Sequence, residues 1–267
     1  MKKTMFGLAI LIGIMGFRAN QQDNSIEQPT SLVKGEHIEY RVHYGFVNAA
    51  EAVVDVDDKF QLANGRPCYK VVVNGRTTGV TDWVTRVRDT WASHIDSEKI
   101  IPQQFYMKKQ EGGYRTEERV IFDHAQKQAR TYELDDNKEK KVFTIPEGVQ
   151  DVVSSYYYVR AMDFAKTKPG ESLPLTFFFD NKLYNMRLKF KGKETIKTKF
   201  GKIETYMIIP MLPKNNFFQD EESVKIWVSN DDNKIPIRVE IELKIGSLAL
   251  DIRSFSGLKN ELKFDKN

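Results

Sequence analysis

The chain has 267 residues and a formal net charge of +4. Of its 41 basic residues, Lys2, Lys3 and Arg18 lie in the first nineteen positions, which hold no acidic residue; this leaves 38 basic against 37 acidic residues. A chain so nearly neutral has no overall field to attract nucleic acid, which excludes a generally basic nucleic-acid-binding protein. A single cysteine, Cys68, excludes an intramolecular disulfide, so burial and hydrogen bonds must hold the fold together.

The first nineteen residues have the layout of a secretory signal peptide. Lys2 and Lys3 give a positive start, residues 5–15 are apolar, and Ala19 is a small residue near the cleavage position. An apolar stretch of about eleven residues is too short for a bilayer, which needs about twenty. We therefore predict an exported protein of the periplasm or cell envelope that starts near Asn20 and is not transmembrane after cleavage. A retained N-terminal anchor is the alternative.

Most of the remaining chain shows the two-residue alternation of half-buried strands. Residues 20–34 are polar and without periodicity, which predicts a flexible lead-in. From His37 onward apolar and polar residues alternate, and turn signals such as Asn64-Gly65 separate the segments, among them a long predicted strand over 80–93. The pattern predicts one all-β domain over residues 35–262, either an antiparallel barrel or a strongly curved sheet.

One segment near the middle of the chain has a helical pattern. Between Pro146 and Pro169 the apolar residues fall on most sides of a helical wheel, which predicts a largely buried helix over about residues 148–165. Pro146 suits a first helical turn, and Pro169-Gly170 cannot continue a helix. We expect this central helix to pack against the sheet or to plug the barrel.

Several short segments, in a fixed order, carry a resemblance to a known family. They are 35–36, 40–45, 50–52, 76–79, 87–89, 102–105, 111–114, 122–123, 150–151, 154–160, 226–231 and 235–239. Together they resemble the DUF3108 family of exported bacterial proteins, which has no established activity. The resemblance covers residues 35–255 and implies an exported, mostly antiparallel β protein. The layout is also similar, in architecture alone, to the half-barrels of periplasmic lipoprotein and lipid carriers, and a shared fold is a weak basis for function.

The segments that resemble the family contain one candidate polar cluster. If these side chains face inward, they must pair with one another to offset the cost of leaving water. The cluster is then a structural ion-pair network or a site that reads glycan or phosphate groups. Its members are Arg76, Asp82, Arg86, Arg88, Asp89 and Glu111.

No catalytic, metal or cofactor site is predicted. The chain lacks a nucleophile-elbow motif and a phosphate-binding glycine loop. His37 and His43 share a strand face but would lie about 20 Å apart, too far to share an ion. Cys68 has no activating partner in the sequence and is predicted to be a core residue.

A proline-bounded loop over residues 210–219 is the candidate for an apolar contact. Apolar side chains in such a loop are expected to cover a cavity or to meet a partner. With two tyrosines of the central helix they make up the predicted ligand-binding set. That set is Tyr156, Tyr157, Met211, Leu212, Phe217 and Phe218.

Three functions are compatible with these features. The favoured hypothesis is a non-enzymatic envelope protein that buries a lipid or another apolar or amphipathic ligand inside the curved sheet. The second is a structural module that binds an envelope protein through a sheet edge or the aromatic loop. The third is an enzyme acting on cell-surface glycan, with Asp82, Asp89 or Glu111 as acid and base. It ranks last because no spacing in the sequence places two carboxylates opposite each other.

Overall fold

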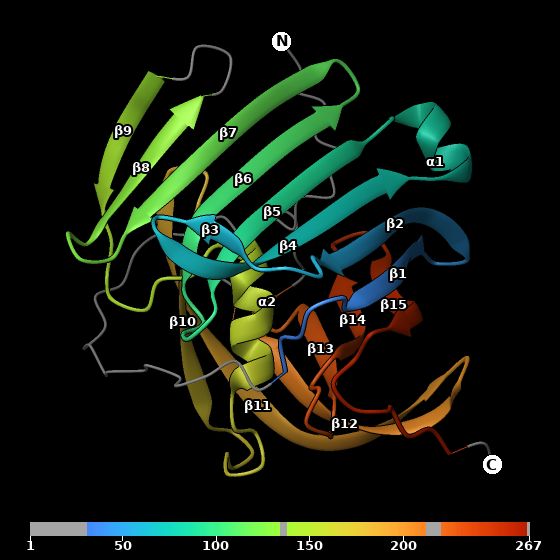
Figure 1. Cartoon of the computed structure of the whole chain (residues 1–267). Coiled ribbons are helices and arrows are strands. Elements are labelled where there is room, and N and C mark those ends of the chain that lie inside the picture. The colour runs from blue at the N-terminus through green and yellow to red at the C-terminus, as the bar shows by residue number, and fades with distance from the viewer. Residues whose placement is uncertain (1–30, 134–137, 212–219, 266–267) are drawn as a thin grey trace.

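The computed structural model describes residues 31–133, 138–211 and 220–265, where fifteen strands form one antiparallel sheet (Figure 1). The predicted signal peptide and residues 20–30 of the lead-in lie outside these ranges. The strands are β1 (His37–Tyr44), β2 (Val47–Val56), β3 (Gln61–Ala63), β4 (Arg66–Thr77), β5 (Arg88–Asp96), β6 (Pro102–Glu111), β7 (Tyr114–Asp123), β8 (Gln128–Glu133), β9 (Lys138–Thr144), β10 (Ser172–Phe179), β11 (Lys182–Thr198), β12 (Gly201–Pro210), β13 (Val224–Ser229), β14 (Pro236–Glu242) and β15 (Ser247–Ser256). The helices are α1 (Gly79–Val84) and α2 (Val152–Ala161).

The order of the strands joins the two ends of the chain in the middle of the sheet. The order is β10-β11-β12-β13-β14-β15-β1-β2-β4-β5-β6-β7-β8-β9, with β3 paired to β4. The last strand, β15, pairs with β1, so that Tyr40 lies opposite Ile252. The sheet stays open because β9 and β10 are not paired with each other. Of the two predicted all-β forms, the strongly curved sheet is therefore the one that the chain adopts.

Helix α2 lies inside the curve of the sheet and is shorter than predicted (Figure 1). Gln150 is held extended because its N–H donates to Thr176 O (2.9 Å) and its carbonyl accepts from Phe178 N (2.8 Å) of β10. The helix then starts after Asp151, whose Oδ1 accepts from Val153 N (2.8 Å) and Ser154 N (2.6 Å). The prediction of a buried central helix is confirmed, and its ends at 148 and 165 are wrong. Within the described residues neither helix is long and apolar enough to span a bilayer.

The predicted strand over 80–93 is wrong in its first half, where the chain forms α1. Gly79 adopts a left-handed conformation (φ +55°) that ends the extended path, and Thr85 N donates to Thr81 O (2.9 Å) to close the helical turn. The sequence pattern misled because valine, threonine and tryptophan favour strands. Val80, Trp83 and Val84 nevertheless recur at intervals of three and four, as on one face of a helix.

A buried ion pair fastens α2 to the sheet. Arg160 and Glu36 have fully buried side chains, with Nη1–Oε1 at 2.6 Å and Nη2–Oε2 at 2.7 Å. Arg160 also donates to the carbonyls of Ser31 (3.1 Å) and Asn233 (3.0 Å), and the Tyr157 hydroxyl donates to Glu36 (2.9 Å). Burial alone would lower the pKa of Arg160, but the charge and hydrogen bonds of Glu36 raise it well above its usual value. The guanidinium of Arg160 therefore keeps its charge within the core.

Removing either partner of this pair leaves a charge buried without its counter-ion. We expect Arg160→Met or Glu36→Gln to lower the free energy of unfolding by about 3–5 kcal/mol, measured by urea denaturation. The double variant Glu36→Leu/Arg160→Met should recover part of the loss, because no unpaired charge remains. Lys166→Met, which breaks the exposed pair with Asp163, is the control and should change stability little. If Lys166→Met lowered the free energy of unfolding as much as Arg160→Met, the special role of the buried pair in stability would be contradicted.

Candidate functional site

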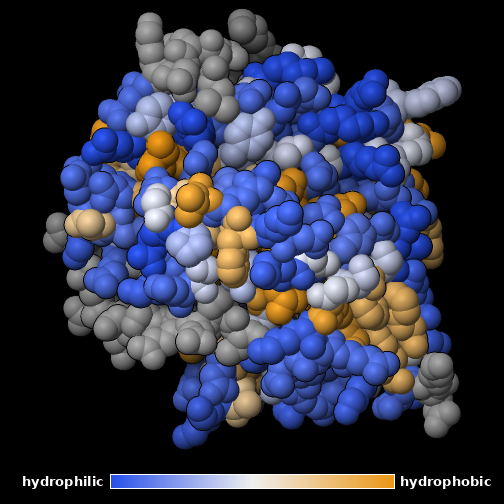
Figure 2. Space-filling model, viewed as in Figure 1, coloured by the Kyte–Doolittle hydropathy of each residue, from blue (hydrophilic) through white to orange (hydrophobic). Residues whose placement is uncertain are grey.

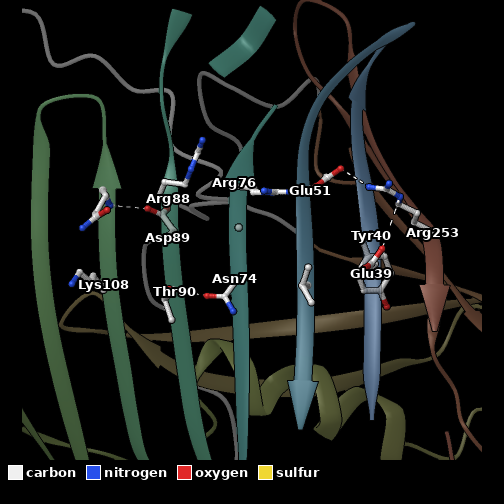
Figure 3. A pocket seen from close by; sticks show the side chains of 13 residues that line it. Glu39, Tyr40, Glu51, Asn74, Arg76, Arg88, Asp89, Thr90, Lys108 and Arg253 are labelled. Atoms are coloured by element: carbon white, nitrogen blue, oxygen red, sulfur yellow. Dashed lines mark hydrogen bonds and ion pairs between the residues drawn. The ribbon is translucent and has the colours of Figure 1, made fainter. Parts of the chain in front are cut away.

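The outer face of the sheet, on the side away from α2, carries a hollow of about 660 Å³, the outer hollow. Figure 3 shows its side chains projecting from neighbouring strands of β15, β1, β2, β4, β5 and β6, with α2 behind them. The alternation along each strand puts these polar side chains outward and their neighbours, such as Tyr40 and Ala52, toward the core. The polar side chains of the lining that point outward are Glu39, Glu51, Asn74, Arg76, Arg88, Thr90, Lys108, Gln110 and Arg253. Tyr40 and Asp89 also border the hollow, although both are buried and alternate with these outward side chains.

One end of the outer hollow is a network of arginines and glutamates. Arg76 donates to Glu51 Oε2 through Nε (3.1 Å) and Nη2 (2.7 Å), and Arg253 donates to Oε1 of the same glutamate. Arg253 Nε also lies 3.9 Å from Glu39 Oε2. The hydrogen bond from Arg76 lowers the pKa of Glu51, and a hydrogen bond from Ser254 lowers that of Glu39. Both carboxylates are therefore ionised at neutral pH.

Two arginines lie directly opposite each other on adjacent strands at this site. Arg76 of β4 pairs in register with Arg88 of β5, and like charges in opposite positions destabilise a sheet. Each arginine has its own acid, Glu51 for Arg76 and Asp82 for Arg88 (Nη1–Oδ1 2.7 Å). The bond from Arg88 lowers the pKa of Asp82 to about 2. The two guanidinium groups are thus held side by side, each paired with a carboxylate of the protein.

Neutral polar groups and a further cation complete the lining. Asn74, Thr90 and Lys108 are consecutive cross-strand partners on β4, β5 and β6. Thr90 Oγ1 donates to Asn74 Oδ1 (2.8 Å), and Lys108 Nζ lies 3.6 Å from Glu117 Oε2. This arrangement offers hydrogen bonds and positive charge over an area that a small polar molecule would fill, since ligand sites commonly enclose about 300–1,000 Å³.

The structure divides the predicted polar cluster between the two faces of the sheet. Arg76 and Arg88 line the outer hollow, and Asp82 pairs with Arg88 from α1. Arg86 is exposed between α1 and β5. Asp89 and Glu111 belong to the opposite face, because the side chain of Asp89 alternates with those of Arg88 and Thr90 and is buried.

Asp89 and Glu111 form a carboxyl pair on that inner face. Asp89 Oδ1 accepts from Gln110 N (2.9 Å), but Asp89 Oδ2 and Glu111 Oε1 are buried and accept no hydrogen bond from any described residue. Burial, followed by the charge of Asp89, raises the pKa of Glu111. The protonated form of Glu111 is therefore favoured beside Asp89.

The predicted apolar ligand residues are only partly described. The Tyr157 hydroxyl donates to Glu36, and the Tyr156 hydroxyl lies 3.0 Å from that of Tyr40. Burial raises the pKa of Tyr156 to about 12, so its phenol stays neutral. Met211 is half-buried just after β12, where its N–H donates to Arg187 O (2.8 Å). Leu212, Phe217 and Phe218 lie outside the described residues.

The single cysteine and the histidines offer little reactive chemistry. Cys68 is buried, and burial raises the pKa of its thiol to about 11, so it is not a thiolate at neutral pH. His37 Nδ1 lies 2.6 Å from Asp55, and His43 Nε2 lies 2.9 Å from Asp251. Across residues 31–133, 138–211 and 220–265, no three His, Cys, Asp or Glu side chains are grouped as a metal site.

Several residues of the outer hollow were missed from the sequence. Glu39 and Glu51 were predicted to be strand residues, and their outward direction follows from alternation. Arg253 belongs to β15, and nothing local shows that the last strand pairs with the first. A search for outward charged residues at matching positions of successive strands would have found Arg76, Arg88 and Glu51, but not Arg253.

Comparisons with known proteins identify a family and a fold. The model of DUF3108, described as a protein of unknown function, matches residues 39–253, which confirms the predicted resemblance. The chain is similar to the beta-barrel-like protein of the DUF1849 domain from Brucella abortus, at 9% identity and a TM-score of 0.54 over 84% of this chain and 99% of that one. It is also similar to a candidate lipoprotein from Parabacteroides distasonis, at 11% identity and a TM-score of 0.30 over 88% and 100%. No curated protein matches the chain.

At 9% identity the first likeness shows a common barrel-like fold and says nothing of a ligand. The second likeness is too weak to carry an argument. The chemistry of the chain must therefore be read from its own site residues.

The raised pKa of Glu111 makes its contribution to stability dependent on pH. In the folded protein the protonated form is favoured, so this stability is fully present below the pKa of the unfolded chain and is lost as the pH rises through the folded pKa. We expect Glu111→Gln to match the parent at pH 4 and to become the more stable protein toward pH 8, measured by urea denaturation across that range. Glu147→Gln, the same substitution at an exposed residue outside the pair, is measured alongside as the control. A Glu111→Gln effect that does not change with pH would contradict the raised pKa of Glu111.

Proposed function

Since the chain belongs to the DUF3108 family, whose function is unknown, we propose from its own geometry that it is a non-enzymatic binding protein of the cell envelope. Its ligand lies in the outer hollow and is a saccharide that carries carboxylate or phosphate groups. The observation that carries this proposal is the facing pair Arg76 and Arg88, set among neutral hydrogen-bonding side chains.

The lining of the outer hollow favours a polar ligand over an apolar one. Four cations line it, and each lies beside a carboxylate: Arg76 beside Glu51, Arg88 beside Asp82, Lys108 beside Glu117 and Arg253 beside Glu39. Guanidinium groups bind carboxylates and phosphates through paired hydrogen bonds, which gives both strength and direction. An anion over Arg76 and Arg88 would contact both guanidinium groups, in addition to the acids with which they already pair. Asn74, Thr90 and Gln110 offer the neutral hydrogen bonds that sugar hydroxyls require.

The carboxylates near the outer hollow support binding rather than hydrolysis. A glycosidase needs one carboxylic acid that stays protonated near neutral pH, beside one that is ionised. Glu39, Glu51 and Asp82 all have lowered pKa values and cannot supply the acid. Glu111 has a raised pKa but lies on the opposite face of the sheet. A glycan hydrolase with Asp82, Asp89 or Glu111 as acid and base therefore gains no support.

Two other predicted modes of binding, inside the sheet and at a sheet edge, meet physical obstacles. An apolar ligand inside the sheet would compete with α2, whose Val153, Tyr157 and Arg160 are already buried there. Strand addition at a sheet edge would use β10 or β9. β10 carries Pro174, which has no N–H, and β9 carries Lys140 and Lys141, and both features discourage pairing.

Export and domain organisation form part of the same proposal. A saccharide of the envelope is met outside the cytoplasm, in agreement with the predicted signal peptide at residues 1–19. The predicted single domain over 35–262 would then be the whole binding unit. Detection of the processed chain in an envelope fraction, with its N-terminus near Asn20, is the expected result; an unprocessed chain in the cytosol would contradict it.

The proposed ligand class is tested by calorimetry with two matched sets of saccharides. We expect cell-wall glycan fragments that carry carboxylates to bind, and neutral oligosaccharides of the same length to bind at least tenfold more weakly. Arg76→Gln/Lys108→Gln should lower the affinity for the acidic fragments by at least tenfold, because two of the four cations are lost. The control Lys141→Gln removes one cation from β9, outside the outer hollow, and should leave affinity unchanged.

Each alternative has its own outcome in that experiment. Equal affinity for neutral and acidic fragments, or an unaffected Arg76→Gln/Lys108→Gln variant, would overturn the proposal. Shortened fragments after prolonged incubation would show a hydrolase instead. Stoichiometric lipid in a solvent extract of the purified protein would instead support a lipid ligand bound inside the curved sheet.

A further inference from the structure

Large hydrophobic side chains are concentrated at one end of the sheet rather than scattered over the surface. Of the thirteen exposed large hydrophobic residues in the described part of the chain, eight lie in four turns at this end, which we name the apolar rim. Trp83 is 94% exposed and Ile245 82%, and Phe46 is fully exposed. The rim consists of Tyr44, Phe46 and Val47 between β1 and β2, Val80, Trp83 and Val84 of α1, Tyr114 at the start of β7, and Ile245 between β14 and β15.

The four turns form one continuous row. The Tyr44 hydroxyl donates to Ile245 O (2.9 Å), which joins the first turn to the β14–β15 turn. Thr78 N, just before α1, donates to Ala49 O of β2 (3.0 Å), and Gly112 N donates to Arg86 O (2.8 Å). These bonds link the β1–β2 turn to α1, and α1 to the β6–β7 turn. In Figure 1 the three lie in that order from the right-hand side to the top of the sheet. In Figure 2 hydrophobic side chains emerge along the same edge among hydrophilic ones.

Helix α1 presents its apolar face to solvent. Val80, Trp83 and Val84 occupy positions i, i+3 and i+4 of one face, and α1 contains no buried residue. An amphipathic helix normally buries that face against the rest of the protein. Isolated exposed hydrophobic residues are ordinary, whereas a contiguous group marks a contact surface.

The charges around the apolar rim indicate what it meets. Arg86, Arg115 and Lys244 are exposed at or beside these turns, and among the described residues none of them is in an ion pair. The acids of the same turns are already engaged: Asp82 pairs with Arg88, and Glu111 lies against buried Asp89. The free charge at the rim is therefore positive.

We propose that the apolar rim docks the protein on the surface of an anionic lipid bilayer. Tryptophan, tyrosine and phenylalanine on short turns place their rings at the level of the headgroups, and free arginines and lysine attract anionic lipids. The contact is peripheral, because the turns are short and only their side chains enter the interface. It involves the end of the sheet, so it is separate from the outer hollow and from the interior.

The experiment is flotation of the full chain with vesicles, monitored by tryptophan emission. Trp83 reports on the rim, because Trp227 is buried and Trp91 half-buried. With vesicles of phosphatidylglycerol and phosphatidylethanolamine we expect the protein to float and its emission to shift to shorter wavelength. Phe46→Ser/Ile245→Ser should weaken the apparent partition at least tenfold, with folding unaffected because both side chains are exposed.

Two further variant pairs separate lipid docking from other contacts. Leu62→Ser/Leu183→Ser removes two exposed hydrophobic residues outside the rim and should float as the parent does. Arg86→Gln/Lys244→Gln should weaken binding to anionic vesicles more than to neutral phosphatidylcholine vesicles. All variants carry the same N-terminal residues, so differences between them report on the rim.

The proposal would be overturned by a parent protein that does not float, or by rim variants that float equally well. A parent that dimerises through the rim, with the dimer lost in Phe46→Ser/Ile245→Ser and no lipid binding, would make the rim an interface between copies. Recovery of a protein partner held by the rim, again without lipid binding, would equally contradict it.

Discussion

The bidentate ion pair between Glu36 and Arg160 is the constraint on which the architecture depends. A guanidinium and a carboxylate without access to water are tolerated only when each satisfies the other. Glu36 directly precedes β1, Arg160 lies near the end of α2, and the guanidinium also binds the carbonyl of Asn233 between β13 and β14. One interaction therefore holds the first strand, the central helix and a late loop together, and the sheet curves around the helix that they fix.

A fixed α2 has consequences for where a ligand can bind. The aromatic side chains that could have lined an internal cavity instead complete the packing, and Tyr156 and Tyr157 use their hydroxyls within the core. The outer face, where the carboxylates of β1 and β2 lie between the arginines of β15 and those of β4 and β5, keeps a hollow of useful size. The barrel-like fold is shared with a structure of 9% identity, so the fold itself does not choose between these two places.

The sequence predicts the strands well because alternation is a local property. Turn residues such as Asn64 and Gly65, both at positive φ, mark where strands end. The central helix is also evident, but its start is not, because the contact of Gln150 with β10 is a tertiary one. Helix α1 was mistaken for a strand because its apolar face is exposed and its residue types favour strands. Pairing of β15 with β1 has no local signal at all.

Part of the candidate site can be predicted from the sequence, namely the part that depends only on which face of its own strand each residue occupies. Arg76, Arg88 and Asp82 were identified together and do meet, whereas Asp89 and Glu111 were grouped with them and point to the other face. Strand alternation already separates Arg88 from Asp89, so that error was avoidable. The contribution of Arg253 depends on the order of strands, which only the folded chain reveals.

The most direct test of this account is native-state hydrogen exchange of α2. If Glu36 and Arg160 hold the helix as a fixed part of the core, the amides of residues 156–161 should exchange only with global unfolding, at the same free energy as the slowest amides of β4 and β5. Exchange of these α2 amides through a smaller local opening, while β4 and β5 stay protected, would contradict the account. The helix would then be a movable element, and the interior would be open to a ligand.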